Sequence, residues 1–453
     1  MDCFFLQRFL YKEALLMTPF DIGLYSLVAI VILVYMGFWV PFALMLSSYI
    51  GVWLIKDSSI LAGKLLALAA SETISSYFFG VVPLFVFMGN VVSATGMGED
   101  AYDVANQAFR KIKGGLAIGT VGANAVFAAV TGISIASAAV FTKIAVPHMV
   151  KFGYSPRFSV GVVAGSSVLG MLIPPSLLLI LYGILTEQSI GDLFVAAIIP
   201  GILLAIVFGF GIFILCIFWK KFVFSEEVQT FGDIELMPLK DFCLKCLPLI
   251  FLISIVLGGI YGGIFTPIEA GAIGSLGAVI IGILKRRLSL KVLWEVLVET
   301  GYITATISFI IIAAQMYARM LALSGMPAEF GSFVVGSDLS IMGIIILYII
   351  LIILMGTILD SGSIMLILVP LMYPILVSLN IDLIWFGIVT VIAVEVGLLT
   401  PPLGISIFVI KSSLDNDKIS LGDIFAGAAP FALMMVAVLL LVIAFPILTT
   451  ILL

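Results

Sequence analysis

Apolar runs close to the roughly 20 residues that a helix needs to cross a hydrocarbon core recur along the whole chain. They are continuously apolar and lack the two-residue alternation of an outer-membrane barrel strand, so the spanning elements are helices. Of 453 residues, 63% are hydrophobic and 10% are charged. A soluble domain has roughly 45–50% apolar and 25% charged residues. The sequence therefore predicts an all-α integral membrane protein with no separate soluble domain.

Ten segments are predicted to span the membrane, and two of them contain breaks. They are residues 21–37, 39–55, 77–96, 157–185, 194–218, 247–264, 267–284, 299–322, 383–409 and 427–450. Two further apolar segments, 115–150 and 340–377, are each long enough for a helix, a turn and a returning helix, so we expect two re-entrant helical hairpins. Residues 101–113 and 285–299 are charged and amphipathic, and are expected to be surface-lying arm helices or interfacial anchors.

The basic residues separate by side if both of these hairpins are re-entrant. Fifteen of the 21 Lys and Arg residues then fall on one face, in residues 110–113, 151–157, 220–221, 240–245, 285–291 and 411–418. The loops at 187–192, 329–338 and 380–382 on the other face contain none. The positive-inside rule makes the basic face cytoplasmic, with both chain termini outside. The basic residues before residue 65 disagree with this orientation.

The two halves of the chain repeat one another. Pro174-Pro175 in GMLIPPS recurs as Pro401-Pro402 in GLLTPPL, a shift of 401 − 174 = 227 residues. The same shift relates three further pairs, Gly170 to Gly397, Pro147 to Pro374 and Ser134 to Ser361. A shift of 226 relates GFWVP at 37–41 to GIFTP at 263–267. Because the two hairpins enter from opposite sides, the halves are predicted to be inverted, as in many secondary transporters, whose solute site lies where broken helices meet.

This repeat predicts a division of the chain into six parts. They are an N-terminal tail (1–20), first-repeat scaffold helices with an arm helix (21–113), a first hairpin and broken helix forming part of a transport domain (114–193), linking and second-repeat scaffold helices with an arm helix (194–338), a second hairpin and broken helix of the transport domain (339–410), and a C-terminal helix (411–453). The tail is interpreted as retained, because no small-residue cleavage site follows it.

Glycine, serine and proline interrupt four stretches that we expect to converge: Thr131–Ser137, Gly170–Ser176, Asp360–Ser363 and Gly397–Pro402. Proline inside a span frees carbonyl oxygens from helical bonding, and such oxygens are tolerated only inside protein or around a wet cavity. Carbonyl and hydroxyl oxygens suit Na⁺, and the N-termini of half-helices suit a carboxylate. The alternative is that these small residues only allow close helix packing.

These stretches supply the candidate site residues. The candidate solute-binding residues are Thr131, Ser134, Ser176, Asp360 and Ser361. One predicted sodium site is formed by Ser134, Ser137, Gly170 and Ile173, the last two through their carbonyl groups. The repeat predicts an equivalent second sodium site, formed by Asp360, Ser363, Gly397 and Thr400, together with Ser361.

Asp360 lies in the middle of the second predicted hairpin, and Glu395 and Arg319 lie within predicted spans; an ionisable group inside the membrane marks a candidate functional site. Asp360 either binds a cation or caps the returning half-helix, and Glu395 either orients the neighbouring break or carries a proton. Arg319, near the end of a span, is expected to extend toward the membrane surface. Cys243 and Cys246 form one CxxC without a second pair or a nearby histidine, so no metal site is expected there.

Eight motifs carry a resemblance to a known family. They are PLFVFMG at 83–89, GGLAIGT at 114–120, TGISIASAAV at 131–140, LGMLIPPSLLLILYG at 169–183, GGIFTPIEAGAIG at 262–274, LDSGSIMLILVPLMYPI at 359–375, FGIV at 386–389 and VGLLTPPLGISIFVIK at 396–411. From about Gly37 to its end, the chain resembles the large membrane (DctM-type) subunit of TRAP (tripartite ATP-independent periplasmic) transporters. It departs from the family at Gly362, where members often carry Thr or Ser, and in its long charged tail.

The resemblance implies sodium-coupled uptake of an organic acid, a dicarboxylate or a sugar acid, across a bacterial cytoplasmic (inner) membrane. It implies an elevator-like movement of the hairpin domain and an inverted-repeat ion-transporter-like fold. It also implies two protein partners, a small four-helix membrane subunit and an extracytoplasmic solute-binding protein. Neither enzymatic activity nor a nucleic-acid partner is expected.

Other functions fit parts of the same pattern. A stand-alone sodium- or proton-coupled carboxylate carrier would use the same hairpins without a binding protein. An intramembrane enzyme would use Asp360 and Glu395 as a catalytic pair, but these residues lie at breaks of the repeat and no further catalytic group is evident on a facing helix. A passive channel is disfavoured because no ring-forming filter motif is present.

Overall fold

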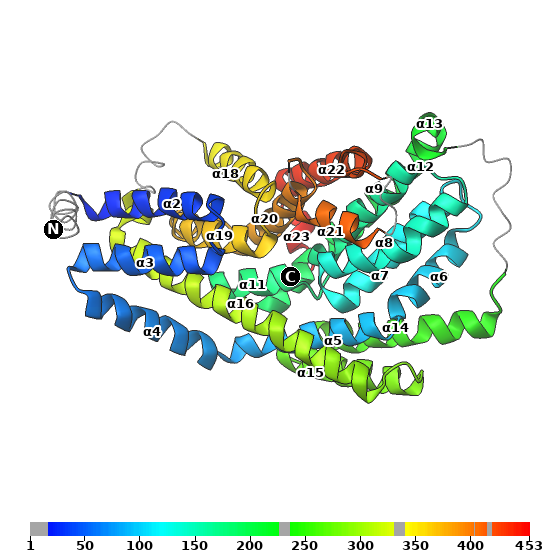
Figure 1. The fold of residues 1–453 in the computed structure, drawn as a ribbon, viewed down its shortest axis with the longest axis horizontal. Helices are drawn as coiled ribbons and strands as arrows, with labels where there is room; N and C mark the ends of the chain where they lie inside the picture. Colours follow the sequence, from blue (N-terminus) through cyan, green and yellow to red (C-terminus); the bar gives the residue numbers. More distant parts are fainter. Residues whose placement is uncertain (1–16, 226–235, 330–339, 403, 415–418) are drawn as a thin grey trace. The chain divides into compact units, whose positions relative to one another are not determined.

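The computed structural model describes residues 17–225, 236–329, 340–402, 404–414 and 419–453. Within these residues the regular elements are helices (Figure 1). One isolated β-bridge joins Tyr154 and Phe224. The chain divides into two compact units. Unit 1 comprises residues 1–79, 305–347 and 365–383, and unit 2 comprises residues 80–304, 348–364 and 384–453. The first 16 residues of the predicted tail and most of the predicted loop at 329–338 lie outside the described residues.

Unit 1 contains three consecutive helices, α2 (Pro19–Tyr35), α3 (Val40–Lys56) and α4 (Ser59–Ser75), and the second part of α16 (Leu290–Ser324). α3 packs against both α2 and α4. Gly23 of α2 meets α16, since a Cβ at Gly23 would lie 2.6 Å from the Ser324 Oγ. The Ser26 hydroxyl of α2 lies 3.4 Å from the Tyr317 hydroxyl of α16. A small residue therefore lets these two helices approach closely.

Unit 2 contains the first hairpin, both broken helices and the helices around them. Its elements are α5 (Val81–Ala94), α6 (Met97–Phe109), α7 (Gly115–Thr131), α8 (Ser134–Lys151), α9 (Pro156–Ser167), α10 (Leu169–Leu172), α11 (Leu177–Thr186), α12 (Ile190–Phe218), α13 (Lys220–Val223), α14 (Leu239–Tyr261), α15 (Pro267–Leu284), α20 (Leu383–Leu398), α21 (Ile405–Ser413), α22 (Leu421–Ala444) and α23 (Ile447–Thr450). Five described elements have residues in both units: η1 (Tyr77–Gly80), α16, α18 (Ile341–Gly356), α19 (Ser361–Ser378) and α20, whose first residue, Leu383, belongs to unit 1.

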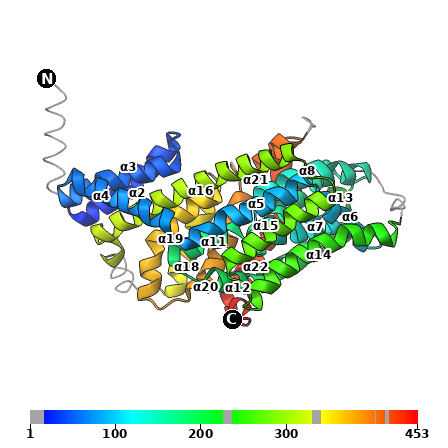
Figure 2. The same ribbon diagram turned by 90° about the horizontal axis from the view of Figure 1, so that it is seen from below.

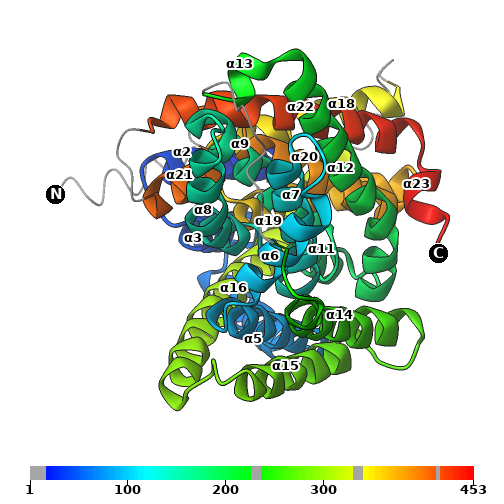
Figure 3. The ribbon, with the colours of Figure 1, turned by 90° about the vertical axis from the view of Figure 1, so that its right-hand side faces the viewer.

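Close backbone contacts hold the helices of unit 2 together. α5 packs along α15 (Figure 2), and α22 packs along α9 and α12 (Figure 3). Gly161 of α9 faces Gly427 of α22, and a Cβ at either position would collide with backbone of the other helix. Small residues thus permit the contact, as is common between membrane helices.

Ion pairs tie α6 to the second half of the chain. Asp100, whose side chain is 2% exposed, lies 2.6 Å from the Lys285 ammonium and 2.9 Å from the Arg287 guanidinium. Asp103 pairs with Lys245 of α14. The predicted arm helix at 101–113 is therefore observed as α6, slightly earlier in the chain, and its acidic face is fixed to α14 and to the end of α15.

The repeated GFWVP and GIFTP motifs form the same turn twice. The backbone φ is +90° at Gly37 and +65° at Gly263, a region in which glycine pays no steric penalty. Pro41 and Pro267 then lie in the first turns of α3 and α15, where the missing N–H costs nothing. The motif is therefore a helix stop followed by a helix start.

The bounds of the helices follow the same repeat. Adding 227 to the bounds of α8, 134 and 151, gives 361 and 378, the bounds of α19. Adding 227 to α11, 177–186, gives 404–413, against Ile405–Ser413 for α21. The predicted hairpins at 115–150 and 340–377 are thus confirmed as the helix pairs α7–α8 and α18–α19.

In the part of the chain that the structure describes, seven helices are long and apolar enough to cross a membrane, or eight if the bent pair α5 and α6 forms one span. Five shorter apolar helices accompany them, α2, α3, α7, α18 and α20. Two elements differ from the predicted set. The sequence analysis did not predict α4, which carries Lys64 and Glu72. It also predicted a separate arm at 285–299 and a span at 299–322, whereas one 35-residue helix, α16, covers most of both segments.

Candidate functional site

The tip of the first hairpin contacts the break in the first broken helix. Gly132, with φ +66°, ends α7, and its carbonyl accepts a hydrogen bond from the Leu177 N–H at 3.1 Å. A Cβ at Gly132 would collide with the Pro175 carbonyl oxygen. Gly170 approaches from the other side, where a Cβ would lie 3.0 Å from the Ser134 backbone nitrogen. The stretches 131–137 and 170–176 therefore meet, as predicted.

The hydroxyl groups at this tip fall into two sets. Thr131 donates to the Phe127 carbonyl at 2.9 Å, and Ser176 donates to the Met171 carbonyl, so these two hydroxyls already have partners. Ser134 and Ser137 are 0% exposed, and neither hydroxyl has a hydrogen-bond partner among the described residues. Both lie in the first turn of α8, so two uncommitted oxygens are present where a cation site is predicted.

Proline also frees backbone oxygens beside these serines. Pro174 and Pro175 have no N–H, so the carbonyl groups of Gly170 and Met171, four residues earlier, lose their helical donors. The Ser176 hydroxyl replaces the donor to Met171. The α10 helix ends at Leu172, and Ile173 has extended backbone, which interrupts the helix at the predicted position.

The second hairpin tip is organised differently. Asp360 precedes α19, and its Oδ2 accepts a hydrogen bond from the Ser363 N–H at 3.0 Å, while the Ser363 hydroxyl donates to Oδ1. These bonds are those of a helix N-cap. Of the two interpretations of Asp360, capping of the returning half-helix is the one the structure contains. Ser361 and Ser363 are buried beside it.

The second broken helix contacts this tip through glycine. Gly356 of α18 and Gly397 of α20 touch, since a Cβ on either would lie 2.7 Å from the Cα of the other. The Gly404 N–H donates to the Thr357 carbonyl at 3.2 Å, and Gly404 corresponds to Leu177, which donates to the first hairpin tip, since 177 + 227 = 404. The end of α18, just before residues 360–363, therefore contacts both sides of the second break.

One predicted oxygen ligand of the second break is already engaged. The Gly397 carbonyl accepts the Thr400 N–H at 3.0 Å, and the Thr400 hydroxyl donates to the Val396 carbonyl at 2.8 Å. Both peptide bonds Pro174-Pro175 and Pro401-Pro402 are cis. Pro174 and Pro175 are buried, whereas Pro401 and Pro402 are exposed, so the second break is the more open of the two.

All candidate residues belong to unit 2, and the two pairs of stretches are linked within it. α21, which follows the second break, packs against α8 and α9 of the first half. The described residues contain no group of three or more His, Cys, Asp or Glu side chains that would hold a metal ion. The oxygens available at the breaks are therefore hydroxyl, carbonyl and isolated carboxylate oxygens, which favour an alkali cation over a transition metal.

Two buried polar groups in this region were missed by sequence reasoning. Ser406, in the first turn of α21, is 0% exposed, and its hydroxyl has no partner among the described residues. Asn124 of α7 donates to the Ser166 hydroxyl at 2.7 Å, but its Oδ1 is buried without a described partner. The available signal for Ser406 was its position four residues after Pro402, just past a break.

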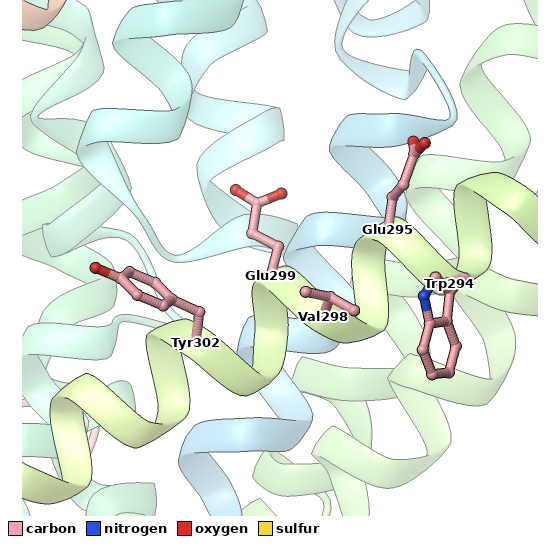
Figure 4. A pocket seen from close by; sticks show the side chains of 5 residues that line it. All are labelled: Trp294, Glu295, Val298, Glu299 and Tyr302. Atoms are coloured by element: carbon pink, nitrogen blue, oxygen red, sulfur yellow. The ribbon is translucent and has the colours of Figure 1, made fainter.

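A surface recess elsewhere does not include any of these residues. It is lined by Trp294, Glu295, Val298, Glu299 and Tyr302, which all project from the first part of α16 (Figure 4). Trp294 is 68% exposed and Tyr302 is 74% exposed. Aromatic side chains of this kind are enriched where membrane helices meet the interface. The recess is therefore a helix surface and not a solute cavity.

Repeated hairpins and broken helices, built from apolar spans, define the class of a multi-pass membrane transporter with the inverted-repeat ion-transporter-like fold. Residues 27–448 match the family described as tripartite ATP-independent periplasmic transporter, DctM component, and the chain belongs to this family. The resemblance predicted from the motifs is thus confirmed.

Three relatives with similar sequences are named as TRAP transporter permease proteins. The chain is 32% identical over 382 residues to the C4-dicarboxylate TRAP transporter large permease protein DctM of Pseudomonas aeruginosa, covering 84% of this chain and 87% of that protein. It is 28% identical over 374 residues to the sialic acid TRAP transporter large permease protein SiaM of Vibrio cholerae, covering 82% and 85%. It is 29% identical over 376 residues to the isethionate TRAP transporter permease protein DctMQ of Oleidesulfovibrio alaskensis, covering 82% of this chain but 57% of that relative.

Solved structures with a similar fold are also membrane transporters. The Neisseria gonorrhoeae MtrF structure aligns with a TM-score of 0.60 at 12% identity, covering 87% of this chain and 85% of that one. The Alcanivorax borkumensis YdaH transporter aligns with a TM-score of 0.55 at 13% identity, covering 81% and 86%. At these identities the likeness concerns the fold alone, and the predicted fold class is confirmed.

Proposed function

We propose that this TRAP permease subunit imports an organic acid together with Na⁺ across a bacterial cytoplasmic membrane. The observation that carries the proposal is the pair of buried, uncommitted hydroxyl groups of Ser134 and Ser137 at the first hairpin tip, where Gly170 approaches the backbone of Ser134. Neutral oxygens of this kind replace the hydration shell of an alkali cation. A bound cation would in turn attract an anionic solute to the neighbouring half-helix N-termini.

The solute class follows from the named relatives and from the chemistry of the breaks. The relatives are named for C4-dicarboxylate, isethionate and sialic acid, which are all organic acids. In this chain Thr131, Ser134, Ser176 and Ser361 remain the proposed solute contacts, and Asp360 is proposed to position them. Because Asp360 carries a negative charge and caps α19, its proposed part is to hold the tip in place rather than to contact the acid directly.

Two protein partners belong to the proposal. An extracytoplasmic binding protein would deliver the solute, and a small four-helix membrane subunit would complete the membrane part. The match to the isethionate permease covers 57% of that relative, so a permease of this family can contain a large additional segment. A second membrane component for the present chain is in keeping with this.

We propose that the solute crosses the membrane by an elevator movement of the domain that binds it. It requires the hairpins and breaks that hold the solute to move together. The gathering of all candidate residues in unit 2, with α21 packed on α8 and α9, supports such a common movement. The division into transport and scaffold parts at residues 114–193 and 339–410 stays part of the proposal.

Uptake by proteoliposomes as a function of external sodium, with the pH clamped, tests the coupling. Ser134→Ala and Ser361→Ala each remove a neutral oxygen at corresponding positions of the repeat, so uptake should require more sodium, by about 3- to 10-fold for a lost ligand of about 1 kcal/mol. Ser93→Ala, outside the breaks, serves as the matched control and should leave the sodium requirement unchanged. Uptake that proceeds equally well in potassium and follows a proton gradient would contradict sodium coupling.

A further inference from the structure

Two free thiols lie on one face of α14, near its basic end. Cys243 and Cys246 are both inside this helix and three residues apart, and residues with this spacing are neighbours on a helix surface. Cys243 is exposed and Cys246 is half-buried. Cys216, the other cysteine in the described part of the chain, is buried. Among the described cysteines, Cys243 and Cys246 are therefore the accessible pair.

The spacing of the pair is close to that of a disulfide but does not match it. Residues at i and i+3 of a helix have Cβ atoms about 5–6 Å apart, whereas a disulfide joins Cβ atoms about 3.5–4.5 Å apart. A bond between the two sulfur atoms therefore requires the helical turn between them to distort. Strained or exposed disulfides are easily reduced again, which is typical of regulatory thiol pairs.

The turn that must distort contains Lys245, which holds a neighbouring helix. The Lys245 ammonium pairs with Asp103 of α6, and α14 packs against α6. Asp100, three residues earlier in α6, is held separately by two cations that follow α15. Lys245 thus fixes the second half of α6. A distortion of this turn moves the Lys245 backbone and draws its ammonium away from Asp103.

The surroundings of the pair favour thiol chemistry. Residues 240–245 belong to the basic face that the positive-inside rule assigns to the cytoplasm, where small thiols keep cysteines reduced. Lys240 is exposed and lies three residues before Cys243, on the same face of α14. A nearby cation favours the thiolate, which is the form that attacks a disulfide.

We propose that Cys243 and Cys246 form a redox-sensitive site for small cytoplasmic disulfides, and that its oxidation releases α6 from Lys245. The exposed Cys243 thiolate attacks the disulfide RSSR, which forms a mixed disulfide and expels one RS⁻. The Cys246 thiolate then attacks the Cys243 sulfur, which closes the bond between the two cysteines and expels the second RS⁻. The two protons of the protein thiols end on the two RSH molecules. One RSSR is thus reduced as one dithiol is oxidised.

The first measurement detects the bond in the full-length chain, held in lipid nanodiscs with one chain per disc and equilibrated with reduced and oxidised glutathione. Free thiols are alkylated, and trypsin cleavage after Lys245 then separates the two cysteines unless a bond joins them. Oxidised glutathione should give the joined peptides in the wild-type chain, and dithiothreitol should separate them. The Cys246→Ser chain should stop at the mixed disulfide on Cys243. Wild-type peptides that stay separate in oxidised glutathione would overturn the proposal.

The second measurement is hydrogen exchange of the α6 amides in the same samples. Oxidation should raise exchange in the second half of α6 by about 1.5- to 5-fold, as loss of one exposed ion pair predicts. Asp103→Asn removes the ion pair beforehand, so exchange should already be raised in the reduced chain and oxidation should add nothing. Glu99→Gln, at an exposed carboxylate in the first turn of α6, is the matched control and should keep the wild-type response.

This inference does not depend on sodium coupling or on the solute, so the uptake experiments do not decide it. A wild-type chain that forms the bond without a rise in α6 exchange would overturn the release of α6. The same holds for a rise of equal size in the Asp103→Asn chain, because that rise would not pass through Lys245.

Discussion

Glycine at the two breaks is a packing requirement, and serine supplies the oxygens. Gly132, Gly170 and Gly397 each touch backbone of a neighbouring stretch, so no side chain fits there. Ser134 and Ser137 are buried in the first turn of α8, and their hydroxyl groups have no described partner. The interpretation that small residues merely permit packing is therefore correct for the glycines, and it does not account for the buried serines.

Gly397→Ala tests the packing at this scale. The added Cβ would lie 2.7 Å from the Gly356 Cα, closer than atoms can approach without a backbone shift. The variant should lose about 1–3 kcal/mol of stability, as overpacked positions do, and thermal unfolding of the full-length chain measures it. Gly258→Ala is the matched control, because no atom lies within 4 Å of its added Cβ. Equal unfolding temperatures for the two variants would refute the contact between α18 and α20.

At the scale of elements, the hairpins and the breaks were predictable because glycine, proline and hydrophobic length are local signals. The predicted segment 115–150 became α7 and α8, and 340–377 became α18 and α19. α4 was not predicted because its two charged residues, Lys64 and Glu72, interrupt the apolar run in the sequence. One of these, Glu72, pairs with Arg319 of α16, so Arg319 has a protein partner that its position in the sequence did not indicate.

The site was predictable only in part, for a physical reason. Spacing in the repeat identified Ser134, Ser361 and the glycines, because they recur. It left open whether Asp360 binds a cation or caps a helix, since an aspartate before a half-helix suits both. Burial of Ser406 and the lack of a partner for Glu395 depend on tertiary packing, which no local pattern encodes.

The two sides of the membrane give a test of how the elements are oriented. In a chain without native cysteines, Ser289→Cys in the basic segment after α15 should react with an impermeant maleimide only from the cytoplasmic side. Ser378→Cys, at the end of α19, should react only from outside. Both positions are exposed in the structure. Labelling of both from the same side would eliminate the inverted hairpins.

At the scale of the whole molecule, the repeat explains why one chain offers two similar but unequal breaks. At a shift of 227 residues, the bounds of α8 correspond to those of α19, and the bounds of α11 correspond to those of α21 within one residue. The breaks differ in side chains, with Val168 in one half and Glu395 in the other. The duplicated scaffold therefore carries two breaks of different polarity. The family places this scaffold in a transporter of several components.

Solute uptake by proteoliposomes under an inward sodium gradient, with each component omitted in turn, tests the central claim most directly. The full set contains this chain, the small membrane subunit and the binding protein loaded with its organic acid. Uptake should require all three components, and should fall to background when the binding protein or the sodium gradient is withheld. Robust sodium-driven uptake by this chain alone would contradict the account and identify a stand-alone carboxylate carrier.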